Sequence, residues 1–216
     1  MYFELKENRP HGTPEHPFSL YHIKNVPHAF QIPVHWHDEL EIIYVKSGSV
    51  HVTISGEHYI GNPGDAFVVS PGSLHFMGSH TGDVDYYTFL FPLEFVSFQM
   101  NDLSEQMLMA PLKSGRMLFQ IQIGKSIEDL CEHLLVLYAR EGDVRNPIRT
   151  TVPKDSAKRI SFVAKQMETK MILLEFLQRM WKNGFIIEND ISGRNATEKE
   201  MISYIQENFT DEISLK

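Results

Sequence analysis

Short apolar runs separated by turn residues dominate the chain up to about residue 124. The runs SVHVTI (49–54) and EHYI (57–60) flank the dipeptide Ser-Gly, which is typical of a two-residue β-hairpin loop. The run AFVVS (66–70) lies between the turn sequences GNPGD (61–65) and PGS (71–73), and VDYYTFLF (84–91) is a further apolar run. Many short strands at close spacing predict an antiparallel sandwich or barrel for this part of the chain.

Helical periodicity replaces the strand pattern after residue 124. A first helix is predicted from apolar residues that recur on one stripe, namely Ile127, Leu130, Cys131, Leu134 and Tyr138. A longer helix is predicted from about 155 to 183, with Gly184 as its C-terminal stop. The chain is therefore expected to combine a β domain with a helical region that follows it.

The longer helix carries two apolar stripes. One stripe contains Ile160, Val163, Ala164, Met167, Met171, Leu174 and Trp181. The other contains Phe162, Ile172, Leu173, Phe176 and Met180. Because one stripe is enough to cover a core, two stripes predict two partners, the barrel and a second subunit. Burial of the second stripe beneath the chain's own loops is the alternative.

The end of the chain changes character again. Residues 185–196 are typical of a linker, and Thr197 with Glu200 forms a capping box that begins another helix. The apolar face of that helix is formed by Met201, Ile202, Ile205 and Phe209. A single amphipathic helix of this length is marginal in water, so we expect the complete protein to continue past Lys216.

Composition and charge narrow the class of protein. The chain has 216 residues, 42% of them apolar and 22% charged, and its formal net charge is −8. This charge disfavours a dedicated nucleic-acid binder, which usually carries a basic face. The amino terminus lacks a signal-peptide layout, no stretch is apolar enough to span a membrane, and Cys131 is the single cysteine. We therefore expect a cytoplasmic protein without a membrane partner.

Chemistry is concentrated in the stretch HWHDELEIIYV (35–45). If this stretch is one strand, alternation turns His35, His37 and Glu41 to the same side. His75 follows a second strand, and three imidazoles with one carboxylate form a donor set that suits a divalent transition metal. Glu39 shares the parity of this set, and we expect it to be solvated or to pair with the second nitrogen of a histidine.

A metal-free reading of the same residues is open as well. The four side chains can form a polar pocket held together by hydrogen bonds alone. Cys131, on an apolar helical face, is expected to be inert core. The sequence contains no nucleophile elbow, phosphate loop, dinucleotide fingerprint or zinc-protease helix, so we do not expect an enzyme.

Two motifs resemble those of the cupin family. His35, His37, Glu41 and Gly48 match the first motif, His-x-His-x(3–4)-Glu-x(6)-Gly, in order and spacing. The second motif is looser. Its corresponding residues are Gly64, Pro71, Gly72 and His75, with altered Gly–Pro spacing and Ser79 where the motif has Asn. The resemblance covers residues 18–92 and implies a mainly β fold, a jelly-roll barrel with the site in its interior.

A narrower resemblance covers more of the chain. The cupin-like part, the two helices and the final segment MISYIQENFTDEISLK together resemble a transcription regulator of the AraC/XylS type. The resemblance implies a ligand-sensing barrel at 1–124 with its amino-terminal arm, a helical dimerisation region at 125–184, a linker at 185–196 and a truncated helix-turn-helix domain from 197 to 216. DNA would be bound only through the part of that domain that is missing from this chain.

The resemblance also implies the mechanism and its partners. A small polar effector, such as a sugar or sugar acid, would be bound in the barrel of a homodimer by His35, His37, Glu41 and His75, with Glu39 beside them. The contacts would be direct or made through one divalent ion (Zn, Ni, Fe or Mn), and the arm LKENRPHGTPEHP is a candidate mobile element. The alternatives are a stand-alone cupin metalloenzyme of the dioxygenase or isomerase type and a dimerisation module whose barrel is filled by its own side chains.

Overall fold

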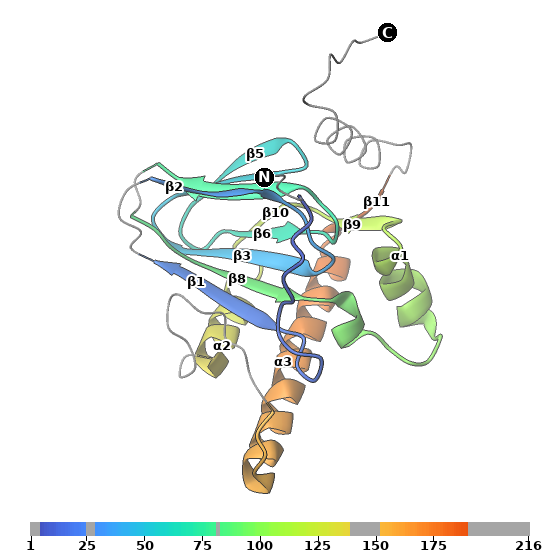
Figure 1. Ribbon diagram of the computed structural model, residues 1–216. Helices are drawn as coiled ribbons and strands as arrows, with labels where there is room; N and C mark the ends of the chain where they lie inside the picture. The colour runs from blue at the N-terminus through green and yellow to red at the C-terminus, as the bar shows by residue number, and fades with distance from the viewer. Residues whose placement is uncertain (1–4, 25–28, 81–82, 139–151, 190–216) are drawn as a thin grey trace, which may run out of the picture.

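Two antiparallel sheets face each other in the amino-terminal part of the chain (Figure 1). The computed structural model describes residues 5–24, 29–80, 83–138 and 152–189. The first sheet contains, in spatial order, β1 (Ser19–Lys24), β8 (Asp85–Phe91), β3 (Leu40–Ser47), β6 (Ala66–Val69) and β10 (Gln122–Gly124). The second contains β2 (Phe30–His35), β7 (His75–Ser79), β4 (Val50–Ile54) and β5 (Glu57–Gly61). The predicted jelly-roll architecture is confirmed.

Turn chemistry fixes the register of these strands. The β4–β5 hairpin closes through Ser55 and Gly56, whose φ angles of 50° and 83° are those of the two-residue loop predicted from the sequence. Gly48, between β3 and β4, has φ of 77°, and a Cβ atom there would lie 2.1 Å from the carbonyl oxygen of Asp83. Only glycine fits this position, which explains the residue that ends the first cupin motif.

Alternation along β3 divides the molecule into two cores. Ile43 and Val45 point between the two sheets, where they pack with apolar residues of β4, β6 and β7. Leu40, Ile42 and Tyr44 point the other way and pack beneath the helices. Both faces of β3 are therefore covered, as its sequence predicts.

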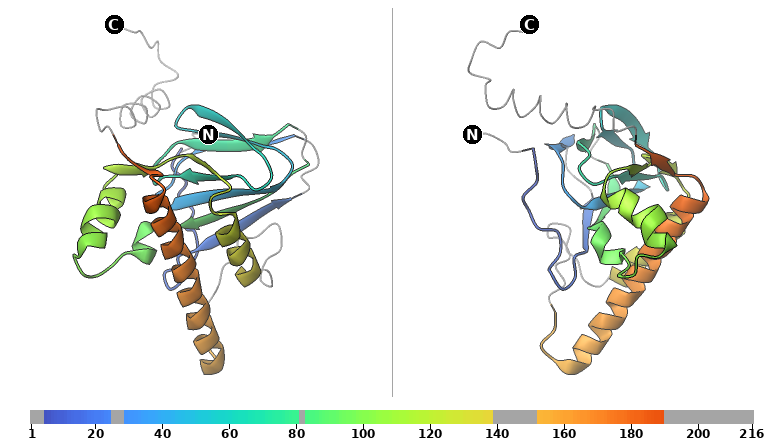
Figure 2. Two further views of the ribbon diagram at one scale, coloured as in Figure 1. Left: turned by 180° about the vertical axis from the view of Figure 1, so that it is seen from behind. Right: turned by 90° about the vertical axis from the view of Figure 1, so that its right-hand side faces the viewer.

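Two helices cover the outer face of the five-stranded sheet (Figure 2). They are α2 (Glu128–Tyr138) and α3 (Ser156–Lys182). The Asp155 carboxylate caps α3 by accepting a hydrogen bond from the backbone N–H of Lys158 at 3.0 Å, and Gly184 follows the helix with φ of 71°. The long helix is confirmed in position and length. The first helix is confirmed from Glu128 to Tyr138, and the residues that follow it lie outside the described part of the chain.

The two apolar stripes of α3 have different surroundings. Ile172, Leu173, Phe176 and Met180, from the second stripe, are buried against the barrel. The first stripe is largely open: the exposed fractions are 74% for Ile160, 51% for Val163, 61% for Met167 and 67% for Met171. The barrel-facing half of the prediction is thus confirmed, and the outer stripe leaves a long apolar surface along the helix.

Short elements connect the barrel to the helices. The segment after β8 contains a 3-10 turn, η1 (Leu93–Val96), a π-helical turn, η2 (Glu105–Met109), and the short helix α1 (Ala110–Lys113). The strand β9 (Met117–Phe119) then pairs with β11 (Ile186–Glu188), so the start of the expected linker forms a strand. The rest of that linker and the helix expected from Thr197 lie outside the described residues. None of the helices described here is long and apolar enough to cross a membrane.

Candidate functional site

The four candidate residues come from three strands and one corner at the same end of the barrel. His35 ends β2, His75 begins β7, and Glu41 lies in β3 of the facing sheet. The interpretation of 35–45 as a single strand was wrong, because the chain bends at Asp38 and Glu39 and passes from one sheet to the other. The side chains converge because strands of facing sheets meet at this corner, where His37 lies.

The three imidazoles and the carboxylate form one compact cluster. One ring nitrogen from each of His35, His37 and His75 lies within 4.8 Å of the others. The carboxylate oxygen Oε2 of Glu41 lies 3.2 Å from Nε2 of His37 and 3.0 Å from Nε2 of His75. The side chains of His37, His75 and Glu41 are almost fully buried, and that of His35 is 19% exposed.

Each histidine of this cluster is oriented by a backbone carbonyl two residues away. The Nδ1 atoms of His35, His37 and His75 lie 2.8, 3.0 and 2.9 Å from the carbonyl oxygens of Pro33, Glu39 and Ser73. A carbonyl oxygen only accepts, so Nδ1 must carry a proton and donate it in all three rings. A neutral imidazole then presents a lone pair at Nε2, which is the atom that faces the cluster.

The electrostatics of the cluster favour a positive centre. Burial alone would raise the pKa of Glu41, but the imidazoles of His37 and His75 outweigh it and hold that pKa well below its usual range. Burial also opposes protonation of His37, yet the bond to Glu41 raises the pKa of this histidine above its ordinary value. The pKa of His35 is lowered, first by burial and then by His75. Glu41 is therefore an anion that faces the Nε2 lone pairs of His37 and His75. Such an arrangement requires a proton or a metal ion between the carboxylate and the rings.

The donor set fits a divalent transition cation. Nε2 of His75 is buried and has no hydrogen-bond partner among the described residues, although Glu41 Oε2 is 3.0 Å away. Two ligands about 2.1 Å from a tetrahedral zinc ion lie about 3.4 Å apart, slightly more than the separations of 3.0 and 3.2 Å from Glu41 in this structure. His35, His37, His75 and Glu41 are thus the residues that would hold such an ion.

Two arm residues that the sequence analysis did not single out lie beside the cluster. The Oε2 atom of Glu7 is 3.6 Å from Nε2 of His35 and 3.6 Å from Nε2 of His11. The His11 ring packs edge-on against His37, with 5.6 Å between ring centroids. Neither residue belongs to a local motif, because the arm reaches the barrel only through tertiary packing.

Glu39 lies at the rim of the cluster. Its Oε2 is 3.7 Å from Nδ1 of His37, and its backbone carbonyl accepts the hydrogen bond of the same nitrogen. The side chain is 20% exposed. Glu39 thus contacts the second nitrogen of a histidine while remaining in reach of solvent.

Tyr86 adds a polar atom to the interior. It lies on β8 among the apolar side chains that fill the space between the sheets, and its ring stacks on that of Phe30. Its hydroxyl is buried without a hydrogen-bond partner among the described residues. Burial raises the pKa of Tyr86, and the negative charge of Glu41 raises it further. The neutral hydroxyl is therefore a buried polar group whose hydrogen-bonding capacity is unused among the described residues.

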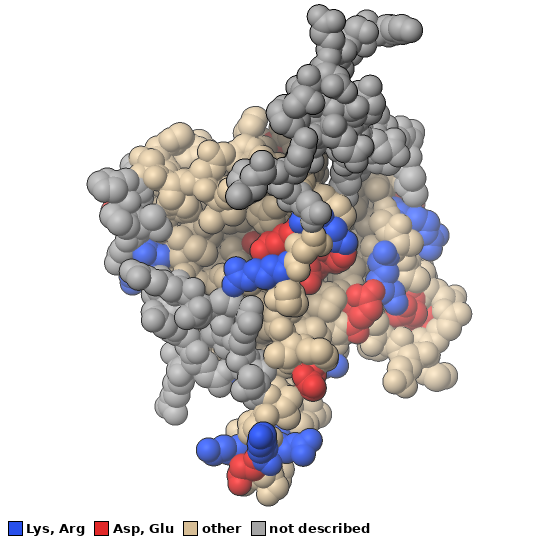
Figure 3. Space-filling view, in the orientation of Figure 1, with Lys and Arg blue, Asp and Glu red and all other residues tan. Residues whose placement is uncertain are grey.

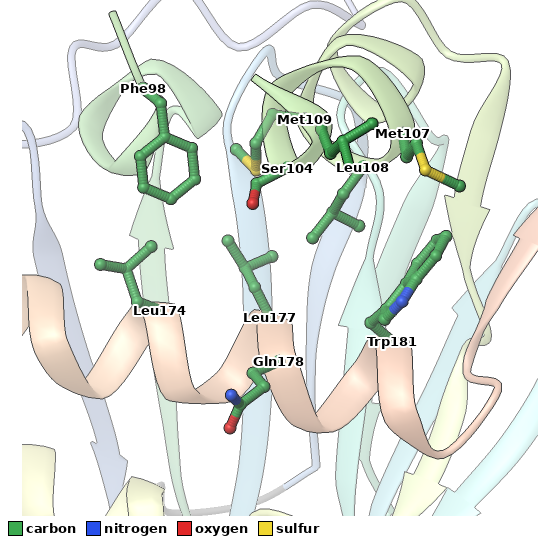
Figure 4. A pocket seen from close by; sticks show the side chains of 10 residues that line it. Phe98, Ser104, Met107, Leu108, Met109, Leu174, Leu177, Gln178 and Trp181 are labelled. Atoms are coloured by element: carbon green, nitrogen blue, oxygen red, sulfur yellow. The ribbon is translucent and has the colours of Figure 1, made fainter. Parts of the chain in front are cut away.

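A concavity lies outside the barrel, and its chemistry differs from that of the histidine cluster. It is an apolar groove of 490 Å³ between α3 and the segment around η2 (Figure 4). Its lining consists of Phe98, Leu103, Ser104, Met107, Leu108, Met109, Leu174, Leu177, Gln178 and Trp181. None of these described lining residues is charged at neutral pH, so metal-binding and acid–base chemistry belongs to the histidine cluster.

Partial likenesses to solved structures accompany this geometry. A conserved protein of unknown function from Streptococcus pyogenes is 16% identical, with 35% of this chain and 62% of that chain covered and a TM-score of 0.30. An RmlC-like cupin from Shewanella frigidimarina is 30% identical, with 30% and 58% covered and a TM-score of 0.28. An oxalate decarboxylase from Bacillus subtilis is 23% identical, with 36% and 22% covered and a TM-score of 0.30. The chain thus spans less than two thirds of each, and likenesses this partial carry no functional argument.

The family assignment comes from the sequence profile of a whole domain. No curated protein matches the chain. The family model described as the AraC-like ligand binding domain matches residues 11–148, which include most of the barrel and the helix α2. This match spans more than half of the chain. The chain belongs to the AraC-like ligand binding domain family.

Proposed function

We propose that this chain is the effector-sensing and dimerising part of an AraC-type transcription regulator. The observation that carries the proposal is the buried cluster of His35, His37, His75 and Glu41 inside a domain of this family. Buried polar groups are normally satisfied. Nε2 of His75 makes no hydrogen bond among the described residues and faces the Glu41 carboxylate at 3.0 Å, which supports a site built for a guest.

The proposed effector is a small polar metabolite such as a sugar or a sugar acid. The Glu41 carboxylate accepts hydrogen bonds from hydroxyl groups, and the Tyr86 hydroxyl can donate or accept one deeper in the barrel. The side chains that surround these two polar groups are apolar, which is compatible with the C–H faces of a sugar ring. Glu39, at the rim, would contact the outer end of the effector.

A divalent transition ion (Zn, Ni, Fe or Mn) is the proposed cofactor of the same cluster. Bound there, it would supply Lewis acidity and open coordination positions for effector oxygens. The chain's own contribution is orientation: the carbonyls of Pro33, Glu39 and Ser73 fix the three rings with Nε2 inward. Burial keeps competing water away from Glu41.

Regulation requires that the effector bind one arrangement of the protein more tightly than another. A physical route exists through the arm, because Nε2 of His16 lies 2.9 Å from the Tyr138 hydroxyl of α2. The same hydroxyl lies 2.8 Å from Oγ1 of Thr169 in α3. The arm therefore touches both the histidine cluster, through Glu7 and His11, and the helix pair, through His16.

The proposed partner of the outer stripe of α3 is a second copy of this chain. Its support is the row of exposed apolar side chains along the helix, among them Met167 and Met171. Contact with DNA would be made by a helix-turn-helix domain, since the net charge of −8 disfavours direct binding by the barrel.

Titration with candidate effectors tests the proposal. The untagged chain is titrated calorimetrically with a panel of sugars and sugar acids, with and without zinc, and the matched variant His37→Ala serves as control. The proposal predicts one saturable binding event that His37→Ala abolishes, together with a change in dimer dissociation in sedimentation experiments. Binding that survives in His37→Ala, or binding that leaves dimerisation and operator affinity of the complete regulator unchanged, contradicts it.

A cupin metalloenzyme is the second candidate function. It is favoured by the donor set itself, because three histidines and one carboxylate leave coordination positions open for a substrate. Turnover of a bound carboxylate or sugar by the zinc-, iron- or manganese-loaded chain, lost in His37→Ala, would decide for this alternative.

A further inference from the structure

The arm crosses the end of the barrel where the histidine cluster lies. In Figure 1 it runs as a dark blue segment in front of the sheets, and in Figure 3 acidic and basic side chains gather side by side where it crosses. Its backbone is joined to the corner after β2, because the N–H of Glu7 bonds to the carbonyl of Trp36 and the N–H of Trp36 bonds to the carbonyl of Leu5, both at 2.9 Å. These bonds place the Glu7 side chain over His35.

We infer that Glu7 completes the cation site from the arm, with His11 holding its carboxylate, so that a divalent transition ion fastens residues 5–16 across the barrel end. This inference rests on the proposed function, because it takes the histidine cluster to be a binding site. It adds Glu7 and His11 to that site. It also predicts that binding of an ion at the site changes how firmly the arm is held on the barrel.

The distances around Glu7 are those of ligands that share an ion. Its Oε2 lies 3.6 Å from Nε2 of His35, which is too long for a hydrogen bond. It lies within the range of about 3.0–3.6 Å expected for neighbouring ligands about 2.1 Å from one five-coordinate ion, with Glu7 as the fifth ligand. Glu41 lies 3.2 and 3.0 Å from His37 and His75, so the two carboxylates contact different histidines of the cluster.

His11 is placed to hold the Glu7 carboxylate. Its Nδ1 lies 2.8 Å from the Tyr21 hydroxyl of β1, which fixes the ring against the barrel. Its Nε2 is buried, lies 3.6 Å from Glu7 and has no hydrogen-bond partner among the described residues. His11 is therefore a positioning residue for Glu7, and it tightens the carboxylate when an ion draws that group inward.

The other ties of the outer arm are weak by comparison. The ion pair of Lys6 with Asp38, at 2.7 Å, is exposed to solvent and screened by salt. The inner end is anchored by the buried His16, which bonds to α2. An ion at Glu7 would thus add a tie to the segment before His16, beside the backbone bonds to Trp36 and the bond of His11 to Tyr21, and its loss would loosen that segment without releasing the anchor.

Zinc titration of the untagged chain with arm variants tests the inference. The Glu7→Gln variant keeps the size of the side chain and removes its charge. The matched control Asp38→Asn removes the other arm–barrel carboxylate, which touches none of the imidazoles. Zinc affinity is measured by competition with a chelator, and arm docking by hydrogen exchange of the amides of Glu7 and Trp36.

The inference predicts that zinc slows exchange of both amides in the wild type and in Asp38→Asn. In Glu7→Gln we expect zinc affinity to fall about tenfold and the zinc-dependent protection to disappear. His11→Ala should weaken zinc binding as well. The melting temperature of this variant is measured in the presence of chelator, and an unchanged value shows that His11 positions Glu7 and is not needed for folding.

Two results would overturn the inference. One is a Glu7→Gln variant that binds zinc as tightly as the wild type. The other is a wild-type protein in which zinc does not protect the arm. Either the arm amides exchange equally fast with and without zinc, or the protein binds no zinc. If His37→Ala still abolishes effector binding in either case, the proposed function stands and only the role of the arm is wrong.

Discussion

Replacing Glu41 separates the folding role of the cluster from its binding role. The Glu41 side chain is 4% exposed and has two imidazole nitrogens within 3.2 Å. In Glu41→Gln, an amide N–H can donate to the lone pairs of those rings, so we expect unfolding free energy at pH 7 to change by about 1 kcal/mol or less. Glu41→Ala leaves the rings unpaired and a void, and should cost about 3–5 kcal/mol. Both variants should lose zinc and effector binding.

The pH dependence of stability gives the same prediction a second test. The lowered pKa of Glu41 contributes stability that is present above pH 4.5 and is lost as pH falls through the folded pKa. The raised pKa of His37 contributes stability that is present below pH 6.5 and is lost as pH rises through its folded pKa. A tenfold change in proton affinity corresponds to about 1.4 kcal/mol of stability. Both pKa changes depend on the contact between Glu41 and His37. The stability curve of Glu41→Gln should therefore be flatter at both ends.

Urea unfolding between pH 2 and pH 8, with chelator present, measures both effects, because the Glu41 contribution is lost only well below pH 4.5. Glu39→Gln is the matched control, because it removes a carboxylate at the rim and leaves the Glu41 pair intact. The reasoning is refuted if Glu41→Gln keeps the pH dependence of the wild type, or if Glu41→Ala is as stable as Glu41→Gln.

Three further predictions follow from other parts of the structure. Gly48→Ala should destabilise the chain by about 2 kcal/mol or more, because a side chain there combines φ of 77° with a clash against Asp83; a stable variant in urea unfolding would contradict this. Tyr86→Phe should leave the melting temperature nearly unchanged and weaken effector binding about tenfold in calorimetry, since the hydroxyl has no described partner to lose; equal affinity would remove Tyr86 from the site. Met167→Glu, on the open stripe of α3, should shift sedimentation towards the monomer without loss of helicity, and an unchanged dimer would mean that another surface pairs the copies.

Local patterns were sufficient for the elements that depend on local physics. The cap at Asp155, the stop at Gly184 and the Ser-Gly hairpin each follow from backbone chemistry within a few residues. The strand period likewise places the neighbouring apolar residues Ile42 and Ile43 on opposite faces of β3, both of which are covered. These features need no knowledge of distant contacts.

Features that depend on distant packing were not predictable in the same way. The bend at Asp38 and Glu39 moves the chain between sheets, so the four site residues converge for a different reason than alternation along one strand. Glu7 reaches His35 through backbone bonds to Trp36, and no periodicity connects the arm to that corner. The pairing of β11 with β9 also joins segments far apart in the sequence.

The location of a bound ion tests the central claim most directly. Crystals of the untagged chain grown with zinc would give an anomalous difference map at the zinc edge. The account predicts a strong peak about 2.0–2.2 Å from ring nitrogens of His35, His37 and His75 and from the Glu41 carboxylate. Rings that point away from one another, or a zinc-containing crystal with no peak at this cluster, would contradict it.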